Sequence, residues 1–146
     1  LVGIQRRGVT LAKMLREMIE QVEGVKLPLG VLDITFYRDD LSILSEHPVV
    51  NATDLPFQVQ DARIVMVDDV LFSGRTARAA MDAICDMGRP SCIQLAVMVD
   101  RGHRELPIRA DYVGKNLPTS KNELVGVRVP EFDGDMSVVL YDKRSE

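Results

Sequence analysis

The middle of the chain, from Ile64 to Thr76, reads Ile-Val-Met-Val-Asp-Asp-Val-Leu-Phe-Ser-Gly-Arg-Thr. Its four leading apolar residues predict the central strand of a parallel sheet, because such a strand is covered on both faces. Two acids end that strand. A short loop with Ser73 and Gly74 then leads into a helix, which we expect from about Thr76 to Met87. The order strand, acids, loop and helix indicates an α/β unit.

Strand and helix patterns alternate on both sides of this unit, which predicts an α/β domain whose central, mainly parallel β-sheet is flanked by helices. A first helix follows the short apolar strand closed by Ile4, with Thr10 as its expected N-cap and Gly24 as its stop. Further expected strands are 29–36, 93–99, 112–114, 124–129 and 138–141. In such sheets ligands bind at the carboxyl ends of the strands, where the polar clusters of this chain also fall.

Length and composition fit a single domain over residues 1–146, because a chain of this size can enclose one hydrophobic core. No apolar run approaches the roughly 20 residues of a membrane span, so we expect no membrane partner. The net charge of −4 argues against a generally basic coat for nucleic acid. A local basic face stays open.

The two cysteines, Cys85 and Cys92, do not form a CxxC pair. Cys85 falls on the helix face that carries Ala80, Met81 and Ile84, and Cys92 falls at the start of a strand. We interpret both cysteines as buried small hydrophobic residues. This usage favours a cytoplasmic protein.

The stretch from Phe72 to Thr76 has the chemistry of a phosphate site. A helix N-terminus offers unpaired backbone N–H groups and a partial positive charge. Gly74 lets the backbone approach an anion closely. Ser73 and Thr76 add hydroxyl donors, and Arg75 adds charge. The loop therefore predicts a phosphate cradle.

Asp68 and Asp69 cannot bind that phosphate, but they can accept hydrogen bonds from sugar hydroxyls or lie near a Mg²⁺-bound diphosphate. A phosphorylated ribose, with an anion at one end and a diol in the middle, matches this order. One alternative is a solvated strand end. Another is the acid pair of a response-regulator receiver, which normally closes the first strand rather than one in mid-chain. A P-loop is disfavoured because there is no GxxxxGK spacing.

Gln5 to Gly8, after the first strand, is a second candidate anion site. Its backbone N–H groups and the guanidiniums of Arg6 and Arg7 suit a diphosphate. A solvated basic turn is the alternative. A third basic cluster lies after the strand that ends near Val99, and its cations would suit RNA phosphates and loop bases.

The thirteen residues from Ile64 to Thr76 resemble the signature of the type I phosphoribosyltransferases. The resemblance implies their fold, a parallel α/β core with a small hood and a flexible arm, here over about residues 37–61. It also implies phosphoribosyl diphosphate as substrate and Mg²⁺ as cofactor. No direct side-chain ligation of the metal is expected. The Mg²⁺ would be held through the diphosphate, near Asp68 and Asp69.

Residues 100–116, 118–121, 34–41 and 88–90 resemble the bacterial pyrimidine operon regulators that are also uracil phosphoribosyltransferases. This implies the conversion of uracil and phosphoribosyl diphosphate to UMP and diphosphate. It further implies binding of pyr mRNA, controlled by UMP or UTP, in transcription attenuation, and a homodimer or higher homo-oligomer. These proteins normally carry a helical segment before the first strand. The chain lacks an initiator Met and opens in an apolar strand, so we expect that an N-terminal helical segment is missing.

The same resemblance assigns the site residues. The catalytic residues are Asp68, Asp69 and Arg38, with Arg38 reaching the diphosphate from the arm. Arg7 stands at the arginine position of the diphosphate loop, whereas the family often has a small hydroxyl residue where Arg6 stands, so the role of Arg6 is open. The expected substrate-binding residues are Arg6, Arg7, Val70, Leu71, Phe72, Ser73, Gly74, Arg75, Thr76, Arg101, Lys115 and Asn116.

The uracil pocket is expected between residues 99–101 and 115–118, where backbone groups can read a pyrimidine edge. The expected RNA-binding residues are His103, Arg104, Arg109 and Lys115. Two other functions stay open at this point. One is an RNA-binding attenuator with only residual transferase activity, and the other is a phosphoribosyltransferase for another base.

Overall fold

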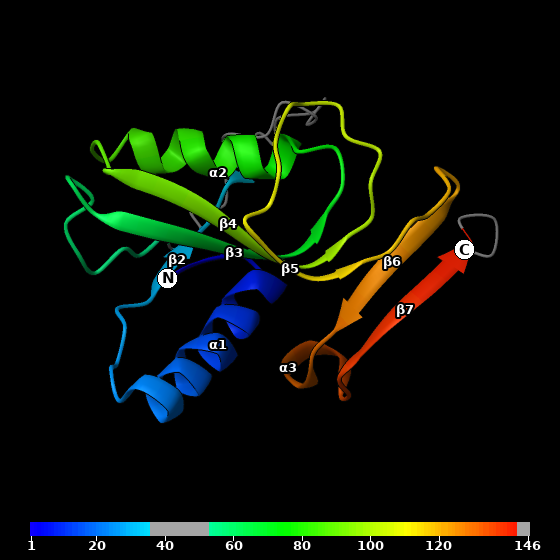
Figure 1. Cartoon of the computed structure of the whole chain (residues 1–146), viewed down its shortest axis with the longest axis horizontal. Helices are drawn as coiled ribbons and strands as arrows, with labels where there is room; N and C mark the ends of the chain where they lie inside the picture. Colours follow the sequence, from blue (N-terminus) through cyan, green and yellow to red (C-terminus); the bar gives the residue numbers. More distant parts are fainter. Residues whose placement is uncertain (36–52, 143–146) are drawn as a thin grey trace, which may run out of the picture.

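The computed structural model describes residues 1–35 and 53–142. Five parallel strands form one sheet in the order β2-β1-β3-β4-β5. These are β1 (Val2–Ile4), β2 (Gly30–Leu32), β3 (Arg63–Leu71), β4 (Cys92–Asp100) and β5 (Tyr112–Asn116). The helices α1 (Arg7–Glu23) and α2 (Arg75–Cys85) lie on opposite faces of this sheet (Figure 1). The predicted α/β architecture with a parallel sheet is confirmed.

A smaller unit, which we call the hood, stands beside the sheet (Figure 1). It consists of β6 (Glu123–Arg128), the short helix α3 (Pro130–Asp133) and β7 (Ser137–Asp142), with β6 and β7 paired antiparallel. Val129 is fully buried and packs in the same cluster as Leu11 of α1 and Val67 of β3. Burying a side chain of this size contributes about 1.5–3 kcal/mol. This contact anchors the hood beside the start of α1.

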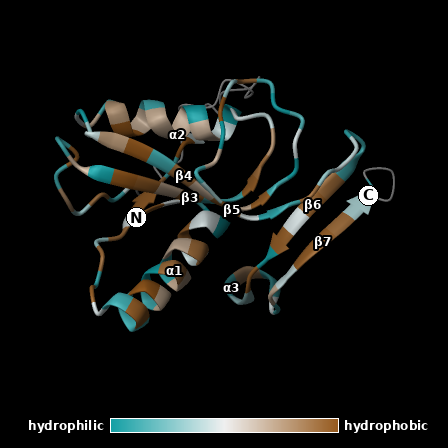
Figure 2. Ribbon diagram, viewed as in Figure 1, coloured by the Kyte–Doolittle hydropathy of each residue, from teal (hydrophilic) through white to brown (hydrophobic). Residues whose placement is uncertain are grey.

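Each face of the sheet has its own hydrophobic cluster. Apolar side chains of β1, β2, β3 and β4 pack on one side with Ala79, Ala80 and Ile84 of α2. Leu11 and Ala12 of α1 pack on the other side. The hydropathy colouring shows these runs as brown segments along β3 and β4 (Figure 2). The sheet is therefore fixed from both faces, and the loops at its carboxyl edge start from a rigid base.

The first helix differs from expectation at its start and agrees at its end. It begins at Arg7 rather than after Thr10, and the side chain of its N-cap, Arg6, makes no capping hydrogen bond. Gly24 ends it in the left-handed conformation with φ of 69°, and its N–H donates to the carbonyl of Glu20 at 2.9 Å. The strand expected at 29–36 is shorter, because after Leu32 the chain leaves the register with β1.

The interpretation of the cysteines as buried residues is wrong for Cys85, which is exposed, and Cys92 is only partly buried. Cys85 is the last residue of α2, and the preceding Ala83 and Ile84 already fill the position against the sheet. Side-chain direction rotates along a helix, so Cys85, which follows these two residues, points away from the sheet.

The predicted flexible arm falls mostly outside the described residues, and so does Arg38. At its C-terminal end, residues 53–61 have little regular structure but pack against the domain. Val59 is buried in the α2-side cluster, and the backbone of Asp54 pairs with that of Val31. This part of the arm is anchored on the core.

Candidate active site

Two adjoining cavities lie at the carboxyl edge of the sheet. The larger, of about 290 Å³, is polar and lies between the ends of β1, β2 and β3; it is lined by Ile4, Gln5, Arg6, Arg7, Asp33, Ile34, Thr35, Asp68, Asp69, Val70 and Thr76. The smaller, of about 140 Å³, lies over the loop before α2; it is lined by Asp68, Val70, Leu71, Phe72, Ser73, Gly74, Arg75, Thr76, Ala77, Leu95 and Val97. Asp68, Val70 and Thr76 line both cavities. The two cavities therefore meet at Asp68, the first residue of the acid pair.

The acid pair belongs to β3 itself, which continues to Leu71. The N–H of Asp69 donates to Oδ1 of Asp68 at 2.8 Å, and the N–H of Val70 donates to Oδ1 of Asp69 at 2.8 Å. Burial of the Asp68 carboxyl and the adjacent charge of Asp69 raise the pKa of Asp68 well above its ordinary value. A carboxyl group in this setting releases its proton most readily when a positive charge arrives nearby.

The loop before α2 has the geometry of an anion cradle. Gly74 has φ of 94°, which L side chains rarely adopt, and a Cβ at this position would lie 3.3 Å from Cβ of Ile108. The carbonyl of Ser73 accepts the N–H groups of Glu105 and Leu106 at 2.9 and 3.0 Å. The segment after β4 thus braces the loop from outside.

The guanidinium of Arg75 points to the segment after β4, because its Nε donates to Oε1 of Glu105 at 2.7 Å. Ser73 Oγ accepts the N–H of Arg75 at 3.2 Å. Arg75 therefore lines the cradle together with Ser73 and Thr76, while its Nε is engaged with Glu105.

Arg101 is buried, with only 5% of its surface exposed. Its guanidinium lies over the ring of Phe72 at 4.2 Å from the centroid, and it donates to Oγ1 of Thr119 and to the carbonyl of Ser120. Asp100 and Asn116 are register partners on β4 and β5, so the two edges expected to frame the uracil pocket are adjacent. Arg101 joins the phosphate loop to the 119–120 loop beside them.

His103 and Arg104 fold back onto the site. Arg104 donates from Nη2 to Asp100 and from Nη1 to the carbonyl of Phe72, both at 2.7 Å. The ring of His103 lies edge-on to Phe72, and its Nε2 is hydrogen-bonded to the carbonyl of Thr119. By contrast, Arg109 and Lys115 are exposed. The four residues expected to bind RNA therefore divide into two that brace the site and two that face solvent.

The hydrogen bond from Arg104 also sets the charge state of Asp100. Burial acts to raise the pKa of Asp100, but the hydrogen bonds from Arg104 and from the N–H of Gly102 outweigh it, so the pKa lies below its ordinary value. Asp100 is thus a fixed anion at the end of β4. It is the last residue of β4, and its place at the end of a buried strand could have identified it in the sequence.

The diphosphate-loop candidates lie at the start of α1. A Cβ on Gly8 would lie 2.4 Å from the carbonyl oxygen of Val67, so only glycine allows α1 to approach β3 this closely. The close approach brings Arg6 and Arg7 to the wall of the polar cavity beside the acid pair. Arg6 lies over the ring of Phe132 at 4.2 Å.

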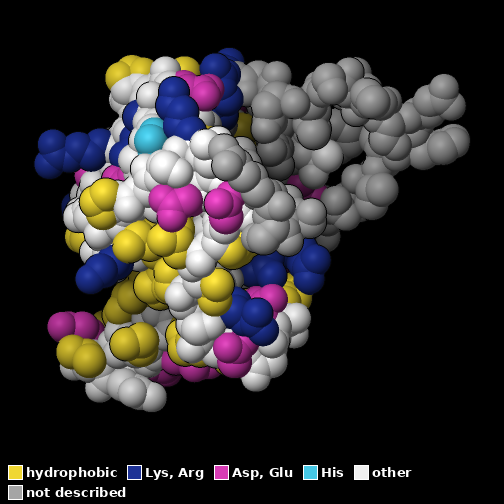
Figure 3. Space-filling view, turned by 90° about the vertical axis from the view of Figure 1, so that its right-hand side faces the viewer, with side chains coloured by type: hydrophobic (Ala, Val, Ile, Leu, Met, Phe, Trp, Pro, Cys, Tyr) yellow, Lys and Arg dark blue, Asp and Glu magenta, His cyan; other side chains and the backbone are white. Residues whose placement is uncertain are grey.

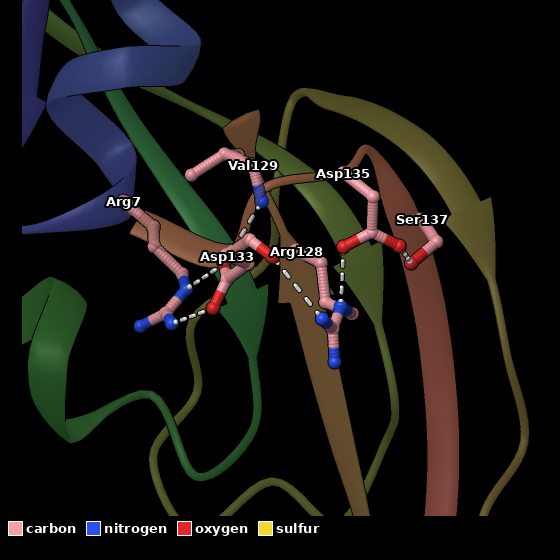
Figure 4. Close-up of polar contacts among 6 residues, drawn as sticks. All are labelled: Arg7, Arg128, Val129, Asp133, Asp135 and Ser137. Atoms are coloured by element: carbon pink, nitrogen blue, oxygen red, sulfur yellow. Dashed lines mark hydrogen bonds and ion pairs between the residues drawn. The ribbon is translucent and has the colours of Figure 1, made fainter. Parts of the chain in front are cut away.

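Arg7 pairs with Asp133 of α3, with Nη2 at 2.9 Å from Oδ1 (Figure 4). The sequence reasoning missed Phe132 and Asp133, because nothing in a stretch more than 120 residues away links it to the first helix. Asp33 and Thr35, which also line the polar cavity, were missed because the sequence predicted a strand as far as residue 36, whereas β2 ends at Leu32.

No cluster of three or more His, Cys, Asp and Glu side chains within residues 1–35 and 53–142 is arranged to hold a metal ion. The oxygen donors present, Asp68 and Asp69, suit a hard cation such as Mg²⁺ that brings further oxygen ligands with it. In the same part of the chain, no helix has the length and apolar character needed to cross a membrane.

Comparison with known proteins identifies a family and several relatives that this chain resembles. The family model described as a phosphoribosyl transferase domain matches residues 1–131. The "Bifunctional protein PyrR" of Caldicellulosiruptor bescii is 69% identical over 140 residues, which are 96% of this chain and 77% of that protein. Those of Acetivibrio thermocellus and Deinococcus radiodurans are 62% and 56% identical over 142 residues, 97% of this chain and 77% and 78% of the relatives.

Solved structures share the fold at low sequence identity. The hypoxanthine phosphoribosyltransferase of Trypanosoma cruzi aligns with a TM-score of 0.69 at 16% identity, covering 97% of this chain and 74% of that one. A purine phosphoribosyltransferase from Pyrococcus horikoshii aligns with a TM-score of 0.57 at 22% identity, covering 80% and 68%. These two likenesses establish the architecture alone.

Proposed function

The chain belongs to the phosphoribosyl transferase family, and within it to the bifunctional PyrR proteins; on that premise we propose that it is a uracil phosphoribosyltransferase that also regulates pyrimidine genes. The observation that carries the enzymatic half is the junction of two cavities at Asp68, beside Asp69. One cavity has an anion cradle, and the other has the cations of Arg6 and Arg7. A ribose with a phosphate at one end and a diphosphate at the other fits that arrangement.

The reaction transfers a phosphoribosyl group from diphosphate to uracil and yields UMP. The bond from C1 to the diphosphate oxygen breaks substantially before the base nitrogen bonds, so positive charge develops on the ribose. Asp68 and Asp69 accept hydrogen bonds from the ribose hydroxyls and stabilise that charge. The backbone from Phe72 to Thr76 holds the 5′-phosphate, and holding both ends lowers the entropic cost of reaching the reactive geometry.

The diphosphate lies against the loop from Gln5 to Gly8, with Arg7 as its main cation. Arg38 belongs to this set by prediction and lies outside the described residues. A Mg²⁺ ion would be held near Asp68 and Asp69 together with the diphosphate, and it would supply charge neutralisation of the leaving group. The protein's own contribution is to orient the diphosphate away from the incoming base.

Uracil occupies the space between the end of β4 and the end of β5, near Lys115 and Asn116. The stack of Arg101 on Phe72 supports this location, because it forms a rigid wall between the cradle and the 119–120 loop. Backbone N–H and C=O groups read the pyrimidine edge. This leaves base identity open to a direct test with other bases.

The regulatory half rests on exposed cations. Arg109 and Lys115 are free to meet RNA phosphates, whereas His103 and Arg104 contact the site and transmit its state. UMP or UTP favours RNA binding to the extent that the RNA-competent state binds the nucleotide more tightly. An attenuator with only residual transferase activity is the second candidate, and the same residues support it.

The assembly and location of the protein are also proposals. Val138, Val139, Leu140 and Tyr141 of β7 are exposed. The view toward the hood shows hydrophobic side chains gathered between charged groups (Figure 3). A homodimer or higher homo-oligomer would cover such apolar surface. We place the protein in the cytoplasm, where its nucleotide substrates and pyr mRNA occur.

One paired experiment tests the function. Transfer from phosphoribosyl diphosphate is measured with uracil, orotate, hypoxanthine and guanine, and a UMP-dependent titration with pyr mRNA is run beside it. We expect turnover with uracil alone and RNA binding that tightens with UMP. Turnover with a purine or with orotate would refute the uracil assignment, and RNA binding without turnover would favour the attenuator.

A further inference from the structure

The short helix α3 grips the first turn of α1 at three points. Arg6 lies over the ring of Phe132 at 4.2 Å. Thr10 donates a hydrogen bond from its hydroxyl to the carboxylate of Glu131. Arg7 pairs with Asp133. Three side chains of the hood therefore contact the segment that borders the polar cavity, and we call this set of contacts the α1–α3 clasp.

The Arg7–Asp133 contact uses two of the three guanidinium nitrogens. Nε donates to Oδ2 at 3.3 Å and Nη2 donates to Oδ1 at 2.9 Å, which is the two-point geometry of an arginine–carboxylate pair. The third nitrogen, Nη1, points away from Asp133 (Figure 4). The side chains of Arg7 and Asp133 are 34% and 17% exposed. The pair is thus partly shielded, and one end of the guanidinium stays available.

Asp133 is itself held on a rigid base. Its Oδ2 accepts the N–H of Val129 at 2.9 Å, and its backbone carbonyl accepts Nη2 of Arg128 at 3.2 Å (Figure 4). Val129 is fully buried in the cluster that includes Leu11 of α1. The carboxylate therefore cannot follow Arg7 freely, and it is Arg7 whose position is constrained by the contact.

We propose that Asp133 is a positioning residue, which fixes Arg7 through Nε and Nη2 so that Nη1 faces the diphosphate of the substrate. The inference rests on the proposed function, because it needs a diphosphate in the polar cavity. An arginine side chain has many rotamers, and one that is already oriented loses less conformational freedom when the ligand binds. The hood thereby prepares the diphosphate side of the site.

An opposite role for Asp133 is distinguished by the direction in which its removal changes the affinity for phosphoribosyl diphosphate. If Asp133 instead competed with the diphosphate for Arg7, its removal would free a full positive charge and tighten binding of phosphoribosyl diphosphate. If it positions Arg7, removal weakens that binding. In both cases a ligand without diphosphate, such as UMP, is unaffected, because UMP occupies the cradle and the ribose site but leaves the diphosphate side empty.

The test compares Asp133→Ala and Asp133→Asn with Asp135→Ala. Asp135 is a matched control, because it pairs with Arg128 at 2.7 Å in the same hood and is not a partner of Arg7. Asn at 133 retains an acceptor for the N–H of Val129, so the hood can keep its fold while Arg7 loses its charged partner. Dissociation constants are measured for phosphoribosyl diphosphate, inorganic diphosphate and UMP, together with kcat and KM.

We expect both Asp133 variants to weaken phosphoribosyl diphosphate and diphosphate about tenfold, the size typical of one lost charge-assisted contact. UMP affinity stays within about twofold, and the control changes none of the three. In an Arg7→Ala background, Asp133→Ala has no further effect. Unchanged or tighter diphosphate binding overturns the inference, and so does an equal loss of UMP affinity. If the unmodified protein binds neither phosphoribosyl diphosphate nor UMP, the proposed function fails instead.

Discussion

The backbone N–H of Asp69 donates to Oδ1 of Asp68 at 2.8 Å, so the carboxyl group of Asp68 is held against its neighbour near the end of β3, before the phosphate loop. Like charges held this close resist simultaneous ionisation. Burial of Asp68 and the charge of Asp69 raise the pKa of Asp68 well above its ordinary value. In the absence of substrate, the acid pair therefore lowers the free energy of unfolding near neutral pH, and this loss of stability is measurable.

Asp68→Asn is expected to stabilise the free protein and to impair catalysis. A carboxyl whose pKa is raised on folding favours the folded state below its ordinary pKa, and this advantage is lost as pH rises through the folded value. Asn does not ionise, so the variant does not lose this stability as the pH rises. Its melting temperature at pH 7 should therefore be about 2–4 °C higher, which corresponds to roughly 1 kcal/mol. The gain should vanish near pH 3, and uracil turnover should fall at least about 100-fold.

Asp86→Asn is the control for this prediction, because Asp86 is exposed at the end of α2. It should change neither the melting temperature at pH 7 nor turnover. A fall in stability for Asp68→Asn that matches its fall in turnover would contradict a catalytic role for the pair.

Gly8→Ala should displace the start of α1. The added Cβ would lie 2.4 Å from the carbonyl oxygen of Val67, and a backbone atom cannot move aside cheaply. We expect a loss of about 1–3 kcal/mol in the free energy of unfolding, measured with urea. Affinity for phosphoribosyl diphosphate should fall as well. Gly126→Ala, whose new Cβ would meet only Cε1 of Tyr141 at 3.5 Å, should be nearly neutral, and equal effects of the two would refute the close-approach argument.

Arg101→Lys should raise KM for uracil more than KM for phosphoribosyl diphosphate. A lysine keeps the charge but loses the planar stack on Phe72 and the fork that reaches Thr119 and Ser120. Leaving those buried partners without a donor costs about 1–3 kcal/mol of stability. Steady-state kinetics and urea unfolding measure both effects. Arg109→Lys, at an exposed position, serves as the comparison, and an unchanged KM for uracil in Arg101→Lys would exclude a role in the base pocket.

Arg109→Ala should weaken RNA binding without changing uracil turnover, because its side chain is exposed and lines neither of the two cavities. Loss of one phosphate contact reduces the slope of log affinity against log salt by about 1. Arg104→Ala should lower both activities, since Arg104 fixes Asp100 and the carbonyl of Phe72. Salt-dependent RNA titrations measure the slopes, with Lys26→Ala as a control. Unaltered RNA affinity in Arg109→Ala would remove this residue from the interface.

Local chemistry explains why the strand, loop and helix that carry the candidate site could be predicted from the sequence. The apolar run before Asp68, the glycine at 74 and the following helix are encoded within thirteen neighbouring residues, so pattern and turn chemistry agree. The same reasoning located the end of α1 at Gly24, because a left-handed residue there is a local requirement.

Contacts between distant segments could not be predicted in this way. The partners of Arg101 and Arg104 depend on how the segment after β4 folds back over Phe72, and no periodic pattern encodes that path. The start of α1 was misjudged because Arg6 gives no capping signal. The exposure of Cys85 could not be predicted, because the composition of a final helical turn does not reveal which side chain points away from the sheet.

The α1–α3 clasp joins residues 121 to 126 positions apart, a far larger separation than that of the acids and the phosphate loop. Contacts between residues so far apart in the sequence form late in folding, because the entropic cost of closing the long loop comes before the free energy gained from the contact. During synthesis the acid pair and the cradle can fold while the hood is still being made. The diphosphate side of the site is then completed only after Asp133 has been synthesised, later than the acid pair and the cradle.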